Sequence, residues 1–560
     1  MQSESQANVT ERQLQWNAVK WREVESAVRN LRQRIFRATR EADLKRVKSL
    51  QRLILRSQAN VLLSIRKLTQ VNAGKNTPGV DKLVVKTPQA RTKLAQQLLK
   101  CEPWKATPAR RVYIPKANGE KRPLGIPTVA DRAMQAVVKS ALEPFWEAKF
   151  EACSYGFRPG RSGHDAIGSI FNYARSRGKK RWIVDADIKG AFDNISHMAL
   201  LELVKGFPAK ELLKQWLKAG YLEKGVFHDA ESGTPQGGVI SPLLANIALH
   251  GMEEALGIKS GSQRNKRGLI RYADDFVIFC ESKEDAEKAT REITSWLVTK
   301  GLEMSVEKTR IRHLTEGFDF LGFNVRIYPA PKTSRTGWKL LIKPSNEAVK
   351  KFKRKVKAIW KAQRGEHMSA LLKALNPVIR GWTNYYRSVV SKTTFNHLDK
   401  WMFGRCVRYA RFRHPAKPWK WIVAKYWGQQ RPDSKDKWVF GDKQKPAYLL
   451  KLNWTPIVRH ILVKGKASPD DPFLQEYWER RKKRQIHILP PKWMGLARTQ
   501  KGKCPQCKSS LFNDEELHIH HVLERKCGGP DSKENLKLMH LYCHQQVHNN
   551  REEEYALLDA

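Results

Sequence analysis

The amino-terminal part of the chain has a helical pattern of apolar positions. Residues 14–71 contain neither proline nor glycine, and apolar side chains recur at Val24, Val28, Leu31 and Ile35 with basic residues between them. Spacings of three and four residues place such side chains on one face of a helix. The pattern predicts basic amphipathic helices, whose charged face either grips RNA or is simply solvated.

Shorter apolar runs replace this pattern between residues 73 and 328. They are typical of strands, and helical stretches such as 284–300 separate them. The strand-like runs are 110–127, which is interrupted by the turn Asn118-Gly119, then 182–188, 269–280 and 318–327. This part of the chain is therefore expected to be a mixed α/β domain.

Beyond residue 345 the pattern is helical again and strongly basic. Phe352, Val356 and Ile359 share one face of the first predicted helix, and lysines cover the other. A charged stretch at 479–485 precedes four closely spaced cysteines near the end. We therefore expect a multidomain chain, because 560 residues are more than one compact hydrophobic core usually contains. The expected units are 1–72, 73–328, 329–430, 431–500 and 501–560.

The chain carries a large excess of basic residues. The chain has 104 lysines and arginines against 55 acidic residues, a formal net charge of +49. Such a surplus repels itself unless a polyanion neutralises it, so nucleic acid is the expected partner. A basic protein bound to ribosomes or membranes is the alternative. No apolar stretch approaches the roughly 20 residues of a membrane span, and no secretory signal is recognisable, so we expect a soluble intracellular protein without a membrane partner.

Two adjacent carboxylates, Asp274 and Asp275, interrupt the apolar run at 269–280. Most Asp-Asp pairs are solvated turns, but the apolar flanks here predict a tight hairpin with the pair at its tip. Carboxylates held so close tolerate joint ionisation only beside a cation, and Mg²⁺ prefers such oxygen ligands. Asp187 ends another apolar run. Asp187 and Asp274 could hold two metal ions about 4 Å apart, one activating a 3′-hydroxyl and one supporting the leaving pyrophosphate.

Three of these segments resemble motifs of a known class of enzymes. Tyr272-Ala273-Asp274-Asp275 resembles the YxDD box of reverse transcriptases, DIKGAFDNI (187–195) their first aspartate motif, and GTPQGGVISPLLANI (233–247) the loop and helix beneath the incoming nucleotide. Finer signatures resemble the group II intron-encoded reverse transcriptase and maturase. These are TPGVDK (77–82), IPKANGEKRPLGIPTVADR (114–132), SYGFRPGRS (154–162) and FDFLGF (318–323).

The resemblance implies a right-hand polymerase, with fingers and palm at 73–328 and a helical thumb at 329–430. It makes Asp187 and Asp274 the primary Mg²⁺ ligands and Asp275 a supporting carboxylate. Lys116 and Arg122 would meet the triphosphate of a dNTP, and Gln236 would lie near the templating pair. Without the resemblance, Lys116 is as readily a solvated loop lysine.

Phe192, five residues after Asp187, stands where similarly arranged RNA polymerases carry an aspartate that accepts the 2′-hydroxyl. An aromatic ring there would clash with that hydroxyl, so dNTP selection is expected. Packing in the core explains the same residue equally well.

The segment NPVIRGWTNYYRSVV (376–390) resembles the start of the maturase thumb, and RHP (413–415) its far end. Aromatic and guanidinium planes such as those of Trp382, Tyr385 and Tyr386 with their arginines suit unstacked RNA bases. Without the resemblance, helix core is the commoner role. The expected partner is the group II intron RNA, which the protein would help to fold for splicing.

The last sixty residues predict two metal sites. Cys504 and Cys507 form a knuckle, and His540 and Cys543 complete a tetrahedral set suited to structural Zn²⁺, with redox use as the rival for the first pair alone. The segment 517–548 resembles an HNH endonuclease with a ββα-metal fold. The resemblance implies that His520, His544 and His548 bind a divalent ion, that His521 is the general base, and that Asn535 braces the loop.

Two positions depart from that family. His518 stands where a glutamate is frequent, and Leu523 where a proline is frequent, so the ligand role of each histidine stays open. The implied protein binds its intron RNA, nicks double-stranded target DNA, and copies an RNA template from the new DNA primer, in a bacterial cytoplasm or nucleoid or in an organelle. The two rivals are a non-enzymatic splicing factor and a nuclease with a polymerase-like binding platform.

Overall fold

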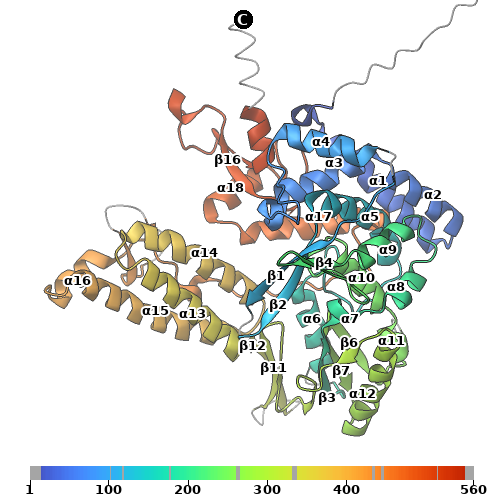
Figure 1. Ribbon diagram of the computed structural model, residues 1–560. Helices are drawn as coiled ribbons and strands as arrows, with labels where there is room; N and C mark the ends of the chain where they lie inside the picture. Colours follow the sequence, from blue (N-terminus) through green and yellow to red (C-terminus); the bar gives the residue numbers. More distant parts are fainter. Residues whose placement is uncertain are drawn as a thin grey trace, which may run out of the picture.

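A computed structural model describes residues 14–100, 103–115, 119–175, 178–259, 265–330, 337–431, 435–442, 447–513 and 515–548. Figure 1 shows the amino-terminal helices beside the fingers and palm, a helical thumb that extends to one side, and a small carboxy-terminal module against the amino-terminal helices.

The amino-terminal helices are those that the apolar spacing predicts. Val28 and Ile35 of the first helix are buried, and Asp43 and Ser57 accept hydrogen bonds from backbone N–H groups at the starts of the next two. The helices of this region are α1 (Trp21–Arg40), α2 (Leu44–Leu55), α3 (Gln58–Arg66), α4 (Pro88–Leu99) and α5 (Val129–Glu147). They pack on α5, so the extension shares its core with the polymerase.

The fingers contain a four-stranded sheet in the order β2-β1-β4-β5. Its strands are β1 (Ala109–Pro115), β2 (Lys121–Ile126), β4 (Tyr221–Glu223) and β5 (Val226–His228). β1 and β2 are antiparallel, and Ile114 pairs with Arg122 close to the connecting turn. The hairpin expected at 110–127 is therefore present, although residues 116–118 of its tip lie outside the described part.

The palm sheet has the order β6-β7-β3-β8, with β9 also paired to β3. Its strands are β3 (Trp182–Lys189), β6 (Gly268–Tyr272), β7 (Asp275–Cys280), β8 (Glu303–Met304) and β9 (Arg310–His313). Alternation along β3 decides which core each residue enters. Val184 and Ala186 join the core of α1, α2 and α5, whereas Ile183 joins the core of the thumb side.

Helices cover this sheet and connect its strands. They are α6 (Gly163–Ala174), α7 (Ala191–Asn194), α8 (His197–Leu203), α9 (Lys210–Lys218), α10 (Ser241–Ala248), α11 (Met252–Ala255) and α12 (Lys283–Val298). A separate three-stranded sheet follows, formed by β10 (Phe318–Phe320), β11 (Phe323–Pro329) and β12 (Trp338–Pro344).

The thumb consists of α13 (Asn346–Ala362), α14 (Met368–Tyr386), α15 (Lys392–Arg413) and α16 (Trp419–Tyr426). Three aromatic residues considered for RNA stacking contribute to its core or to its junction with the palm. Trp382 contacts the rings of Phe352 and Tyr386, and the hydroxyls of Tyr385 and Tyr386 donate to the carbonyls of Leu321 and Gly322. Exposed aromatic side chains lie farther along, at Phe412, Trp419 and Trp421.

The chain then returns across the palm towards the amino-terminal helices. It forms β13 (Trp427–Gly428), β14 (Val439–Asp442), β15 (Ala447–Tyr448), α17 (Gln475–Lys483) and α18 (Pro491–Thr499). The carboxy-terminal module has the antiparallel pair β16 (Leu517–His521) and β17 (Leu536–His540), followed by a helix at 541–548.

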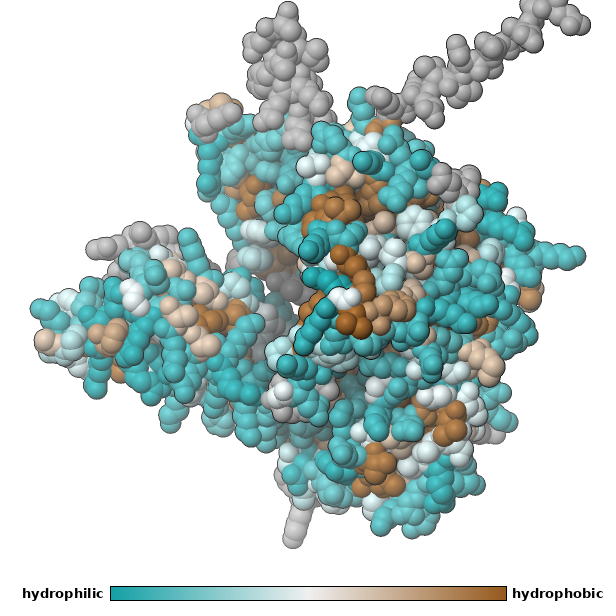
Figure 2. Space-filling view, in the orientation of Figure 1, coloured by the Kyte–Doolittle hydropathy of each residue, from teal (hydrophilic) through white to brown (hydrophobic). Residues whose placement is uncertain are grey.

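The face seen in Figure 2 is mainly hydrophilic, with small separated apolar areas, as the excess of charged residues leads one to expect. Among the described helices, none combines the length and the apolar character that crossing a bilayer requires.

Candidate active sites

The palm brings the three predicted carboxylates to one end of its sheet. In the antiparallel register of β3 and β7, Asp187 lies directly opposite Asp275. Tyr272 pairs with Asp275 across the hairpin, so Ala273 and Asp274 form its two-residue turn. Residues at odd positions of both strands face the thumb side, because Ile183, Val277 and Phe279 pack there. Asp187 and Asp275 therefore share that face, with Asp274 at the tip beside them.

Buried contacts fix the turn that carries Asp274. Ala273 has a left-handed backbone with φ of +59°, a conformation that costs energy for any residue with a Cβ. Arg271, completely buried, donates to the carbonyl of Ala273 at 3.2 Å and to the side chain of Asn246 at 2.9 Å. Asn246 in turn donates to the carbonyl of Gly156 at 2.8 Å. A Cβ on Gly156 would lie 2.4 Å from the nitrogen of Ala273, so only glycine permits this approach.

The electrostatics of the palm site favour a bound cation. Burial, together with the charges of Asp274 and Asp187, raises the pKa of Asp275 to about 7, and burial also raises the pKa of Asp274. Lys308, which sequence reasoning missed, forms an ion pair with Asp187, and this contact raises the pKa of the ammonium. An all-oxygen set of crowded carboxylates fits Mg²⁺.

Two of the predicted nucleotide-binding residues approach this end of the palm. Burial raises the pKa of Asp274, and the charge of the Arg122 guanidinium, which comes from the fingers, partly offsets that rise. The side chain of Gln236 donates to the carboxylate of Asp193 at 3.0 Å. The backbone carbonyl of Gln236 accepts from the backbone N–H of Gly125 at 2.9 Å. Lys116 lies outside the described residues.

Phe192 lies in α7, directly after the strand that carries Asp187. Its ring meets that of Phe157 edge to face, with centroids 6.2 Å apart. Phe157 is 52% exposed and has a left-handed backbone, φ of +57°. Phe192 is half-buried, so its ring is partly in the core and partly available to a ligand.

The four predicted zinc ligands form one cluster. In the part of the chain that the structure describes, Cys504, Cys507, His540 and Cys543 offer ligand atoms that all lie within 4.8 Å of one another. Nε2 of His540 lies 3.1 Å from the carbonyl of Ser510. A carbonyl only accepts, so Nε2 carries the proton and Nδ1 faces the sulfurs. Three thiols and one imidazole fit a closed Zn²⁺ site.

The three predicted nuclease ligands form a second cluster of this kind, made of His520, His544 and His548. His520 is buried in β16, and its ring meets those of His544 and His548, which lie one helical turn apart. Burial, followed by the neighbouring imidazoles, lowers the pKa of His544 to about 4, which keeps that ring neutral. Three imidazoles with their nitrogens close together fit a divalent transition metal. The cluster does not include His518, which pairs with Glu516 at 3.4 Å.

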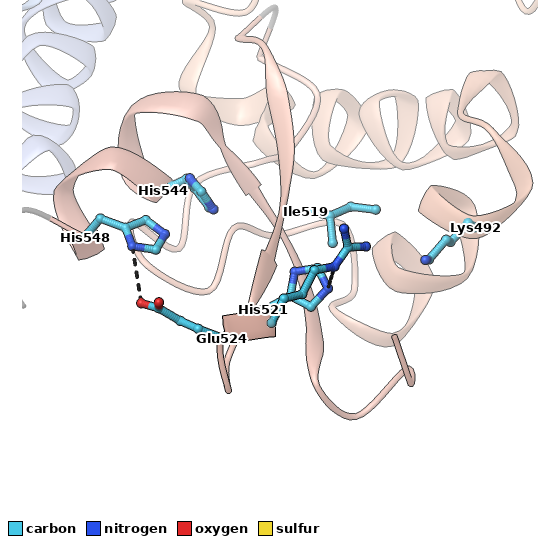
Figure 3. A pocket seen from close by; sticks show the side chains of 7 residues that line it. Lys492, Ile519, His521, Glu524, His544 and His548 are labelled. Atoms are coloured by element: carbon cyan, nitrogen blue, oxygen red, sulfur yellow. Dashed lines mark hydrogen bonds and ion pairs between the residues drawn. The ribbon is translucent and has the colours of Figure 1, made fainter. Parts of the chain in front are cut away.

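His521 lines a pocket of about 450 Å³ beside this cluster, together with Glu524, His544 and His548 (Figure 3). Its Nε2 lies 2.7 Å from a carboxylate oxygen of Asp531, a contact that sequence reasoning missed. Arg525 contacts both partners, at 3.1 Å from His521 and 2.9 Å from Asp531.

Asn535 lies at the other end of the loop that follows His521. Its side chain accepts from the nitrogen of Leu523 at 2.7 Å, and donates to the carbonyls of Leu523 at 3.0 Å and Pro530 at 2.9 Å. These bonds close the loop between β16 and β17, so the loop is braced without the proline that often stands at position 523.

Four segments of the chain match known protein families. Residues 114–325 match the reverse transcriptase (RNA-dependent DNA polymerase) family, 16–98 the N-terminal domain of reverse transcriptase, 349–427 the maturase-specific domain of group II introns, and 504–550 the HNH endonuclease family. YkfC of Escherichia coli is 36% identical over 316 residues, which cover 50% of this chain and 82% of YkfC.

The chain belongs to the group II intron-encoded reverse transcriptase and maturase family. It contains the polymerase, maturase and HNH endonuclease domains of such proteins, and the fold class expected from the sequence is confirmed.

Other relatives are partial matches. The group II intron-encoded protein LtrA of Lactococcus lactis is 34% identical, over 48% of this chain and 55% of LtrA, so this chain spans about half of that relative. An uncharacterized 91 kDa protein in the cob intron of Schizosaccharomyces pombe is 27% identical over 81% of this chain and 64% of its own length. Among solved structures, a telomerase from Candida albicans in complex with a telomeric RNA fragment has a TM-score of 0.33 at 14% identity, covering 55% of this chain and 58% of that one.

Proposed function

We propose that this group II intron protein polymerises DNA on an RNA template at the palm site. The single observation that carries the proposal is the register of β3 and β7, which sets Asp187 opposite Asp275 beside the turn of Asp274. Asp187 and Asp274 are the primary Mg²⁺ ligands, and Asp275 supports them. The metal supplies charge stabilisation at the reacting phosphate.

The residues around the carboxylates then have distinct tasks. Arg122 and Lys116 bind the triphosphate of the dNTP, Gln236 contacts the templating pair, and the ring of Phe192 excludes a 2′-hydroxyl. The contact between Phe192 and Phe157 supports this last role, because it holds the ring from the side.

The thumb is proposed to bind intron RNA and to assist its splicing. Its exposed aromatic residues lie among cations, which suits unstacked bases and phosphates. The guanidinium of Arg364 lies 3.7 Å from the ring centre of Phe412, and Lys425 lies 5.0 Å from that of Trp421. Splicing that added protein leaves unchanged at physiological magnesium would contradict this role.

The HNH domain is proposed to nick one strand of double-stranded target DNA. His521 takes a proton from the attacking water, a new P–O bond forms, and the bond to the 3′-oxygen breaks, after which that oxygen takes a proton from solvent. The released 3′-hydroxyl end is the primer for the polymerase. His520, His544 and His548 hold the divalent ion, Asn535 braces the loop, and Cys504, Cys507, His540 and Cys543 hold Zn²⁺.

We infer the corresponding division of the chain: 1–72 as the basic extension, 73–328 as fingers and palm, 329–430 as thumb, 431–500 as DNA-binding region and linker, and 501–560 as nuclease. The inferred location is the cytoplasm or nucleoid of a bacterium, with an organelle as the alternative.

The deciding experiment extends a DNA primer on an RNA template with the wild type and with Asp274→Ala. We expect extension by the wild type alone. Extension by neither protein would favour a non-enzymatic splicing factor. Nicking of supplied DNA that survives Asp274→Ala but fails in His521→Ala would separate the two sites, whereas nicking by His521→Ala at the wild-type rate would remove it as the base.

A further inference from the structure

The nuclease and the polymerase meet at a buried arginine. Arg66, in the last turn of α3, is only 2% exposed. Its guanidinium donates to Glu25 of α1 at 3.3 Å and to Glu515 of the nuclease at 3.0 Å, and it lies 4.6 Å from the ring centre of Trp21. The side chain of Glu515 is only 8% exposed. Separating the domains would break the ion pair between Arg66 and Glu515. Removing a partner from a buried ion pair lowers stability.

Further bonds surround this contact and come from residues beside the zinc cluster. Ser509 donates to Glu25 at 2.8 Å, and the hydroxyl of Tyr542 donates to the carbonyl of Gln70 at 2.6 Å. Gln546 donates to the carbonyl of Asn17 at 3.1 Å. Tyr542 lies between His540 and Cys543 in the sequence, so the metal cluster and the docking face are formed by the same short segments.

The chain that leads to the nuclease is anchored as well. We call residues 460–481 the strap. Asp165 of α6 accepts from His460 at 2.8 Å, from the nitrogen of Val463 at 2.8 Å and from Arg481 at 3.3 Å. Arg161 donates to the carbonyl of Gly465 at 2.7 Å.

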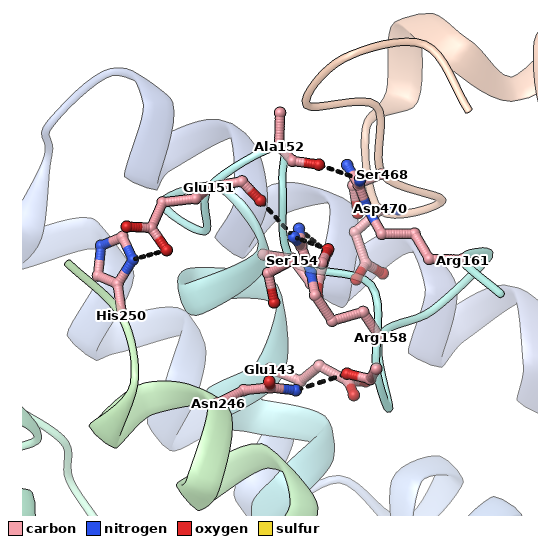
Figure 4. A network of polar contacts seen from close by, with 12 residues as sticks. Glu143, Glu151, Ala152, Ser154, Arg158, Arg161, Asn246, His250, Ser468 and Asp470 are labelled. Atoms are coloured by element: carbon pink, nitrogen blue, oxygen red, sulfur yellow. Dashed lines mark hydrogen bonds and ion pairs between the residues drawn. The ribbon is translucent and has the colours of Figure 1, made fainter. Parts of the chain in front are cut away.

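The strap also reaches α1. Arg32 of α1 holds Asp470 with two bonds, of 2.8 and 2.7 Å, and Glu143 with a third of 2.9 Å. Figure 4 shows Ser468 and Asp470 of the strap beside Arg158 and Arg161 of the palm.

Both anchors use one face of α1. Glu25 and Arg32 are seven residues apart, which is close to two helical turns and about 10.5 Å along the axis. Glu25 accepts a hydrogen bond from Ser509 of the nuclease, and Arg32 donates to Asp470 of the strap. The nuclease is therefore held to the polymerase at two points and is not merely tethered by its linker.

We propose that Arg66 is a positioning residue that holds the nuclease at a fixed place on the polymerase, so that a DNA end made by nicking passes to the palm without dissociation. This rests on the proposed function. A fixed placement raises the effective concentration of the new 3′-end at the palm relative to a loosely tethered nuclease.

The test compares wild type with Glu515→Arg, which opposes Arg66 with a like charge. Glu287→Arg is the matched control, because Glu287 is exposed on α12 and lies outside the strap. Three reactions are measured on the full chain with its intron RNA: nicking of supplied DNA, extension of a pre-annealed primer, and the share of nicks that are extended in one reaction. Hydrogen exchange at 62–75 reports docking.

For Glu515→Arg we expect faster exchange at 62–75, wild-type nicking and extension taken singly, and a several-fold loss of extended nicks. If exchange is unchanged, or if it rises while the share of extended nicks stays at the wild-type level, the inference is wrong.

If Glu515→Arg nicks poorly by itself, Arg66→Gln on the polymerase side decides by the same comparison. A wild type that fails to nick or to extend would contradict the proposed function, while the exchange measurement would still decide the docking.

Discussion

The guanidinium of Arg271 donates a hydrogen bond to the carbonyl of Ala273, so a completely buried side chain holds the residue that precedes Asp274. Replacing Arg271 by methionine removes this bond and the bond to Asn246. We expect the free energy of unfolding to fall by about 1–3 kcal/mol and primer extension to fall more than nicking, because the turn of Asp274 loosens. Chemical denaturation and the two activity assays check this.

Arg291→Met is the control for that substitution, because Arg291 is exposed on α12. Equal losses of extension and nicking in Arg271→Met would indicate general unfolding instead of a loosened turn.

Phe192→Val should admit ribonucleotides. The smaller side chain leaves room for a 2′-hydroxyl, and it also loses the contact with Phe157. We expect the ratio of ribonucleotide to deoxynucleotide incorporation to rise by at least an order of magnitude, measured as a ratio of kcat/KM values. Phe171→Val, at an exposed position of α6, should leave the ratio unchanged. An unchanged ratio in Phe192→Val would assign that ring to packing alone.

Lys308→Met should lower the Mg²⁺ concentration that supports half-maximal extension. The ammonium and the metal compete for the carboxylate of Asp187, so removing the ammonium frees that ligand. Titrating Mg²⁺ at saturating dNTP measures the effect, with Lys283→Met on α12 as an exposed control. A higher Mg²⁺ requirement in Lys308→Met would show that the lysine assists the site.

Asp165→Asn should weaken the strap in a pH-dependent way. Burial alone would raise the pKa of Asp165, but bonds from His460, Ser162 and Val463 hold it below its usual value of 3.8. A depressed pKa contributes stability above the unfolded value, and that contribution disappears as pH falls through the folded value. The variant should therefore be less stable at pH 7, by about 1–3 kcal/mol, and the difference should shrink below about pH 4.

Denaturation curves at both pH values test this, with the exposed Glu211→Gln of α9 as control. A difference between wild type and Asp165→Asn that is constant with pH would mean that the charge of Asp165 is not what holds the strap.

Zinc removal should release the nuclease as well as unfold it. Ser509 and Tyr542, which bond to Glu25 and Gln70, lie within two residues of the proposed ligands. We expect one zinc per chain by metal analysis, lost in Cys507→Ser, and faster hydrogen exchange at 62–75 in that variant. Protein that contains no zinc as purified would contradict the assignment of this cluster.

Local patterns made much of this fold predictable. The apolar runs at 182–188 and 269–280 predicted the strands and the hairpin that carry Asp187 and the Asp274-Asp275 pair, and the spacing of Cys504, Cys507, His540 and Cys543 indicated their cluster. Such features depend on residues that are close together in the sequence, so they can be recognised from one sequence.

The contacts that were missed join residues far apart in the chain. Arg271 bonds to Asn246, Asn246 bonds to Gly156, and Arg66 bonds to Glu515. Residues so far apart in the sequence cannot be paired from a helical or strand period. The strap lay within a region expected to bind DNA, yet many of its polar groups bind the palm and α1. Trp382 was considered for RNA because its neighbours are basic, and its ring is partly buried against those of Phe352 and Tyr386.

The seven-residue interval between Glu25 and Arg32 has a practical consequence for anyone who shortens this protein to a stand-alone polymerase. A cut after residue 500 keeps the strap but removes Glu515 and Tyr542, the partners of Arg66 and of the carbonyl of Gln70. Such a truncated enzyme should be redesigned at Arg66 together with the cut. Inserting or deleting a single residue within that interval would turn one anchor about 100° away from the other.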